Sequence, residues 1–260
     1  MNKKLSCALS IFLLFGLMLP SCRPRDKEAE HVVSGAVIPT AVLPKGEDLG
    51  QAYIDSFIFL GESTTYHLKS RGVLSGGTDT AQVWGPSNGT VNLDTTIATL
   101  KIVYPPTKEL LTVGEAVRRE QPARILLCFG LNGAVGNVKR GKDYFQSCYR
   151  LLIDTIQRNS PATEILLQSA FPVAENMDMT HFSVDLDTLN AHIRTINTWT
   201  KELAYSLGLG YLNTAEILTD ESGRLFLAYQ SGDGHHLSAE AYQKILYYIR
   251  THGAEKEDTT

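Results

Sequence analysis

Four short apolar runs, separated by longer amphipathic stretches, constrain the fold of this chain more than any other feature. They cover residues 56–60, 124–129, 164–169 and 210–213, and aliphatic and aromatic side chains dominate them. Runs of this length and composition are typical of parallel strands that are buried on both faces. A fifth strand is expected between residues 82 and 93, although Gly and Pro residues there obscure its ends.

Helical periodicity fills much of the sequence between these runs. We expect helices over residues 141–158, 186–207 and 238–250. Alternation of buried strands with amphipathic helices predicts an α/β fold in three layers, doubly wound, around a mainly parallel five-stranded sheet. Such sheets bind ligands at the carboxyl ends of their strands, so the residues that directly follow each strand are the first candidates for a functional site.

The N-terminal segment has the features of a secretory signal. Lys3 and Lys4 precede an apolar run from Ile11 to Leu19, which is too short to span a bilayer. The residues from Leu19 to Cys22 resemble a bacterial lipobox, and this resemblance implies cleavage before Cys22 and attachment of lipid to it. An ordinary secretory signal cleaved nearby is the alternative. In both cases the mature protein is expected outside the cytosol.

The rest of the chain divides into three parts. Residues 23–50 mix charges with Pro and Gly and show no period, so we expect a flexible tether. Residues 51–253 suffice for one domain with a single substantial core, and residues 254–260 form a short tail. We therefore predict a signal peptide and lipobox over residues 1–22, followed by tether, domain and tail.

Charge and cysteine content exclude some classes of function. The formal net charge is −4 and no dense basic cluster occurs, so we expect no nucleic acid partner. Cys7 leaves with the signal and Cys22 is the predicted lipid site, which leaves two cysteines in the domain. Cys128 is interpreted as a small core residue, and a bridge between Cys128 and Cys148 stays open.

Three polar motifs follow predicted strands or precede the last helix. Ser63, within Gly-Glu-Ser-Thr, comes at a strand-to-helix turn, and Asn132 follows the second strand in Gly-Leu-Asn-Gly. Asp233 stands three residues before His236, a spacing that lets a carboxylate orient an imidazole. Taken singly, each motif has an ordinary interpretation as a helix cap, a glycine-rich turn or a polar loop.

In this chain order, the three motifs resemble those of the SGNH or GDSL hydrolase family over residues 56–250. The resemblance implies a flavodoxin-like hydrolase domain, with Ser63 as the nucleophile and His236 and Asp233 as the rest of a catalytic triad. It also implies that Asn132 and a glycine donate hydrogen bonds to the oxyanion. His235 falls one position short of the family spacing and is the weaker candidate for the base.

Two positions of the motifs need separate treatment. For the oxyanion glycine we favour Gly89 over Gly85, because a donor N–H is needed near a tight turn and Gly85 is followed by a proline. Glu62 stands where the family has aspartate, and the extra methylene affects how the carboxylate braces the turn. Gly133 also replaces a residue that is often aspartate in the family.

These features predict an extracytoplasmic serine esterase, lipid-anchored to the outer face of a bacterial membrane or cell envelope. Its expected substrates are short-chain acyl esters, above all acetyl esters, of carbohydrates or small molecules. One alternative is a lipase or lysophospholipase acting at the membrane. Another is an inactive lipoprotein that keeps the fold to bind glycans, with Glu62 as a first sign of lost catalysis.

No cofactor or metal is expected. His67, His181 and His192 do not group with Cys or carboxylates at ligand spacing, so we interpret them as surface histidines. Trp84 could stack on a sugar ring, but packing in the core is the favoured interpretation. The loop over residues 174–184 could line the acyl or leaving-group side, or simply connect two elements at the surface.

Overall fold

The computed structural model of the protein describes residues 41–253. The predictions for the signal peptide, for Cys22 and for the tail over residues 254–260 therefore lie outside the described residues. Within the described part, the centre is a five-stranded parallel sheet with the strand order β2-β1-β5-β6-β7. Its strands are β1 (Phe57–Gly61), β2 (Val83–Trp84), β5 (Arg124–Cys128), β6 (Glu164–Gln168) and β7 (Gly210–Leu212).

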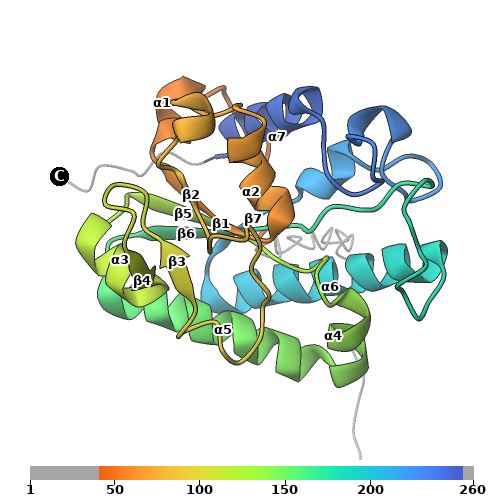
Figure 1. Ribbon diagram of the computed structural model, residues 1–260, viewed down its shortest axis with the longest axis horizontal. Helices are drawn as coiled ribbons and strands as arrows, with labels where there is room; N and C mark the ends of the chain where they lie inside the picture. The colour runs from red at the N-terminus through yellow and green to blue at the C-terminus, as the bar shows by residue number, and fades with distance from the viewer. Residues whose placement is uncertain (1–40, 254–260) are drawn as a thin grey trace, which may run out of the picture. The chain divides into compact units, whose positions relative to one another are not determined.

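Helices cover both faces of this sheet (Figure 1). One face carries α1 (Gly50–Asp55), α2 (Ser63–Ser70) and α7 (Ala239–Thr251). The other face carries α3 (Val113–Glu120), α5 (Lys142–Asn159) and α6 (Leu186–Leu207), with α4 (Ala134–Arg140) beside α5 and α6. The smaller elements are η1 (Gly77–Asp79), β3 (Lys101–Val103), β4 (Leu110–Thr112), η2 (Thr214–Ile217) and η3 (Leu227–Tyr229).

Alternate residues of each central strand enter two different cores. In β1, Phe57 and Phe59 pack on the side of α1 and α7, whereas Ile58 and Leu60 pack on the side of α5 and α6. All five residues of this strand are buried. The apolar run that predicted a doubly covered strand thus has its physical reason in two separate helical layers, and the predicted three-layer α/β/α fold is confirmed.

The predicted tether ends too late. Leu43 donates a backbone hydrogen bond to Tyr211 of β7 at 3.0 Å, and Tyr211 donates to Ala41 at 2.7 Å. Asp48 pairs with Arg250 of α7 at 2.9 Å. The segment 41–49 is therefore part of the folded domain, because the exposed edge of β7 and the end of α7 offer partners that its Pro and Gly content does not reveal.

The strand and helix predictions missed α1, α3, α4 and the antiparallel hairpin of β3 and β4. The start of α3 does carry a local signal, since Thr112 and Glu115 form a reciprocal capping box. Cys128 is buried, as predicted, and neither it nor Cys148 forms a disulfide. No helix within residues 41–253 combines the length and apolar character of a membrane span.

Candidate active site

The loop before α7 brings a histidine to the serine that follows β1. Ser63 is the first residue of α2, and its Oγ lies 2.9 Å from Nε2 of His236. On the other side of the same ring, Nδ1 lies 2.7 Å from Oδ2 of Asp233. Residues that are 173 positions apart in the chain thus form one line of hydrogen bonds from carboxylate to imidazole to hydroxyl.

The geometry of the Asp233 loop is held by its own backbone. Oδ1 of Asp233 accepts hydrogen bonds from the backbone N–H groups of His235 and His236. Burial opposes the charge on this side chain, but the hydrogen bonds from His236 and His235 outweigh it and lower the pKa of Asp233. Asp233 therefore stays an acceptor for the His236 ring throughout the range in which histidine titrates.

Gly234, inside this loop, permits its close docking. Its φ is +83°, and a Cβ built on it would lie 2.6 Å from the backbone N and Cα of Met177. Its carbonyl accepts a hydrogen bond from the N–H of Ala174 at 2.7 Å. The segment after β6 thus holds the Asp233–His236 loop, and a side chain at position 234 would push the two apart.

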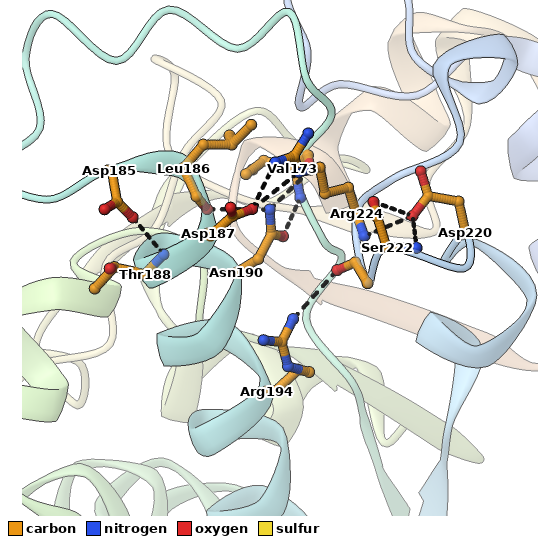
Figure 2. Close-up of polar contacts among 11 residues, drawn as sticks. Val173, Asp185, Leu186, Asp187, Thr188, Asn190, Arg194, Asp220, Ser222 and Arg224 are labelled. Atoms are coloured by element: carbon orange, nitrogen blue, oxygen red, sulfur yellow. Dashed lines mark hydrogen bonds and ion pairs between the residues drawn. The ribbon is translucent and has the colours of Figure 1, made fainter.

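A network on α6 fixes this supporting segment (Figure 2). Asn190 accepts from the backbone N–H of Val173 at 2.9 Å and donates to its carbonyl at 3.1 Å. Beside it, Arg224 donates to Asp187 at 2.7 Å, which ties the loop between η2 and η3 to the same helix. The loop that carries His236 is therefore supported from α6 through Val173 and Ala174.

Burial lowers the pKa of His236; the hydrogen bond to Asp233 opposes this, and the nearby His235 and Arg71 reinforce it. Two further imidazoles contact this ring. The His67 ring stacks on it with centroids 3.9 Å apart and an interplanar angle of 19°, and the His235 ring lies at 3.9 Å and 44°. The interpretation of His67 as a surface residue is wrong, because its place on α2, one turn after Ser63, brings it against the loop.

Glu62, the residue before the serine, is only 2% exposed and caps the loop after β5. Its carboxylate accepts backbone N–H groups from Gly130 at 2.8 Å and from Leu131 and Asn132 at 3.0 Å. Burial raises the pKa of Glu62 to about 7, against these three hydrogen bonds. The Glu62 side chain, one methylene longer than aspartate, thus reaches three donors in the loop after the neighbouring strand β5.

The side chain of Asn132 points toward the loop after β2. Its Nδ2 donates to Oγ1 of Thr90 at 2.8 Å, and the second N–H of the same amide remains available for another acceptor. Sequence reasoning had not singled out Thr90. Its neighbour Gly89 has φ +72° and packs against the Tyr66 ring.

The N–H of Gly89, which was the favoured oxyanion donor, is occupied. It donates to the Pro86 carbonyl at 2.9 Å, because residues 86–89 form a tight turn. The structure gives a separate reason for glycine here, namely the positive φ and the ring of Tyr66. The N–H of Gly89 is therefore not free for a ligand in this conformation.

The remaining predicted residues lie away from this hydrogen-bonded line or support it. Trp84 is 2% exposed and packs edge-on against Tyr104, so it offers no face to a sugar. Met177 and Met179 are partly buried against the core. Among residues 41–253, potential metal ligands gather only at Asp233, His235 and His236, all in the loop before α7.

Comparisons with known proteins bear on the fold and the family of the chain. Residues 59–244 match the model of the GDSL-like lipase/acylhydrolase family. A lipolytic protein of the G-D-S-L family from Desulfitobacterium hafniense superposes with a TM-score of 0.51 at 15% identity, covering 75% of this chain and 97% of that one. A GDSL-like lipase from Bacteroides thetaiotaomicron superposes with a TM-score of 0.51 at 16% identity, covering 78% of this chain and 90% of that one.

At these identities the two structures show a shared fold. No curated protein sequence matches the chain. The family match, however, covers Ser63 as well as the loop of Asp233 and His236. The chain therefore belongs to the GDSL-like lipase and acylhydrolase family, and it is an ester hydrolase.

Proposed function

We propose that the protein cleaves esters with Ser63 as nucleophile, His236 as general base and Asp233 as the residue that orients the base. The observation that carries this proposal is the continuous line Asp233 to His236 to Ser63, with hydrogen bonds of 2.7 Å and 2.9 Å. The bond from Nδ1–H to Asp233 leaves the lone pair of Nε2 directed at the serine hydroxyl. That tautomer is the one that can accept the serine proton.

The reaction follows from these positions. His236 takes the proton of Ser63 while Oγ attacks the ester carbonyl, and the protonated imidazole then gives that proton to the departing alcohol. Water, deprotonated by the same Nε2, attacks the acyl-serine, and the imidazolium returns that proton to Oγ of Ser63 as the acid leaves. The Asp233 carboxylate remains ionised and stabilises the imidazolium in both steps.

In this proposal two groups donate to the oxyanion. Ser63 is the first residue of α2, so its backbone N–H has no acceptor within the helix. Asn132 supplies the amide hydrogen that Thr90 does not use. A third donor from Gly89 requires that its N–H leave the Pro86 carbonyl, so we assign the main contribution to Ser63 and Asn132.

For the substrate we propose short-chain acyl esters, above all acetyl esters, of carbohydrates or small molecules. The segments over residues 70–80, 86–90 and 137–142 are mostly polar or glycine-rich, and none forms the amphipathic lid that a long acyl chain needs. One observation favours a lipase as second candidate: Phe226 and Leu227, 41% and 49% exposed, lie on the chain just before the catalytic loop.

Acyl chain length separates these two candidates. Each buried methylene contributes about 0.8 kcal/mol of binding free energy. In an enzyme with an apolar trough for the acyl chain, kcat/KM should therefore rise steadily from acetate to palmitate esters. We expect kcat/KM to be highest for p-nitrophenyl acetate and lower for the octanoate and palmitate esters. A steady rise with chain length, reduced by polar replacement of Phe226 and Leu227, would put the lipase first.

We further propose that the enzyme is anchored outside the cytosol through lipid on Cys22. The support is the lipobox-like sequence alone. Replacing Cys22 by Ala should shift the protein from the membrane fraction to the medium, or leave it unprocessed, because lipid would be its anchor after signal cleavage. A mature, membrane-bound Cys22→Ala protein would contradict the anchor without affecting the catalytic proposal.

The alternative of an inactive glycan-binding protein is less well supported. The only sequence feature that suggested it was Glu62, and the Glu62 carboxylate accepts three hydrogen bonds from the loop that carries Asn132. Labelling with a fluorophosphonate, followed by mass spectrometry, tests activity directly. We expect modification of Ser63, none in Ser63→Ala, and far slower labelling in His236→Ala than in His235→Ala. Modification of a different serine would contradict the assignment.

A further inference from the structure

His67 contacts the proposed base from the same helix that carries the proposed nucleophile. It lies four residues after Ser63 on α2, so the two side chains share one face of that helix. The His67 and His236 rings are nearly parallel, at 19°, with centroids 3.9 Å apart. One helix face thus presents a hydroxyl to the edge of the His236 ring and a flat ring to its face.

The polar edge of His67 does not explain this placement. Its Nδ1 is buried and lacks a hydrogen-bond partner within the described part of the chain. Burial, together with the charges of His236 and Arg71, lowers the pKa of His67 to about 4. A buried, unpaired ring nitrogen is unfavourable, so Nδ1 does not stabilise His67 in this position. The favourable contact of His67 with His236 is made by the flat, uncharged face of its ring.

His236 needs such a contact. The hydrogen bond from Nδ1 to Asp233 fixes one point of the imidazole, and this bond alone does not stop the ring from rocking about that point. Rocking moves Nε2 away from Oγ of Ser63, and a displacement near 1 Å costs on the order of 100-fold in rate. A parallel ring at van der Waals distance restricts this motion, and because it is neutral it does not repel the imidazolium formed during turnover.

From this geometry we infer that His67 is a positioning residue, which holds the His236 ring by stacking so that Nε2 stays directed at Ser63. The inference rests on the proposed function, since it assigns a task to His67 only if His236 is the base. It predicts that the aromatic face matters and that the ring nitrogens do not.

Three variants test the inference: His67→Ala removes the ring, His67→Phe keeps a flat ring without nitrogens, and His67→Gln keeps a polar side chain without a ring. The readouts are the rate constant of fluorophosphonate labelling at Ser63, and kcat and KM with p-nitrophenyl acetate. We expect His67→Ala to lower the labelling rate and kcat about 10- to 100-fold, with KM within about twofold. His67→Phe should recover most of this loss, and His67→Gln little of it.

His252→Ala is the matched control. His252 stacks on Tyr248 at 3.6 Å and 5°, at the C-terminal end of α7, so this variant removes a similar stack away from the serine. Its labelling rate should equal that of the wild type. If His67→Ala fails to fold, as judged by circular dichroism, the comparison of the Phe and Gln variants decides.

Equal labelling rates in the wild type and His67→Ala would overturn the inference, and so would recovery by Gln that matches recovery by Phe. Both results leave the proposed function intact. Absence of any label on Ser63 in the wild type would overturn the proposed function, and the inference with it.

Discussion

Replacing Gly234 by Ala should damage both stability and catalysis, because two separate costs meet at this position. A residue with a Cβ pays about 1–2 kcal/mol for the left-handed φ of +83°. The new Cβ also lies 2.6 Å from the backbone of Met177, and forcing such a contact apart costs about 1–3 kcal/mol more. The sum is about 2–5 kcal/mol of unfolding free energy.

For a domain of this size, 1 kcal/mol shifts Tm by about 2–4 °C, so the expected loss in Tm is about 4–20 °C. Residue 234 lies between Asp233 and His236 in the chain. Relief of its clash with Met177 must therefore move Asp233, His236 or the segment that contains Ala174. We therefore expect kcat to fall at least about 10-fold at a temperature where the variant is still folded. Thermal unfolding by circular dichroism and kinetics with p-nitrophenyl acetate measure the two effects.

Two other glycines separate the causes. Gly208 has φ +65° but open space around its Cβ position, so Gly208→Ala should cost only the backbone strain of about 1–2 kcal/mol. Gly136 lies inside α4 with open space and no positive φ, so Gly136→Ala should stabilise by about 0.5–1 kcal/mol. If Gly234→Ala proves no more destabilising than Gly208→Ala, the close contact with Met177 does not exist as described.

Three further predictions concern the proposed active site. Because the pKa of His236 is lowered and only the neutral ring accepts a proton, kcat should fall with decreasing pH at a midpoint below the ordinary value of about 6.5; a flat profile to pH 5 would argue against a histidine base. Asn132→Ala should lower kcat about 100- to 1000-fold with little change in Tm, as measured by steady-state kinetics and thermal unfolding; unchanged kcat would remove Asn132 from the oxyanion site. Glu62→Ala leaves three N–H groups unpaired, those of Gly130 and Leu131 buried and that of Asn132 partly buried, and should cost about 3 kcal/mol or more in denaturant unfolding, with Glu62→Asp intermediate. The control is Glu202→Ala, at an exposed glutamate. If Glu62→Ala lowers the free energy of unfolding no more than Glu202→Ala does, the capping role is contradicted.

The layered fold could be predicted because its strands are buried on both faces and therefore consist of continuous apolar runs. Helix α6 has the predicted bounds, since its period is long and Gly208 ends it. Strand β2 has only two residues and follows turn-rich sequence, so its limits could not be predicted. The pairing of residues 41–43 with β7 is a long-range contact, so no local sequence pattern could predict it.

For the site, the chain order of the motifs, through its resemblance to the GDSL family, could join Ser63, Asp233 and His236 in one hypothesis. It could not predict the contacts that the neighbouring residues make. The capping of the loop after β5 by Glu62 depends on two neighbouring strands ending at the same level. The turn that occupies the N–H of Gly89 depends on backbone angles that glycine and proline leave open. The stacking of His67 had a usable signal, its four-residue separation from Ser63, which becomes informative only once α2 is known to begin at the serine.

The segment from Ala41 to Leu43 has a consequence for handling the protein. It runs beside β7 and occupies hydrogen-bonding groups of a strand that would otherwise end the sheet. A free edge of this kind is a template for pairing with another chain, and so for aggregation. A domain cut at residue 51 would expose that edge, whereas one that begins before Ala41 keeps it covered. The solubility of the isolated enzyme should therefore depend on Ala41, Val42 and Leu43, which take no part in the proposed chemistry.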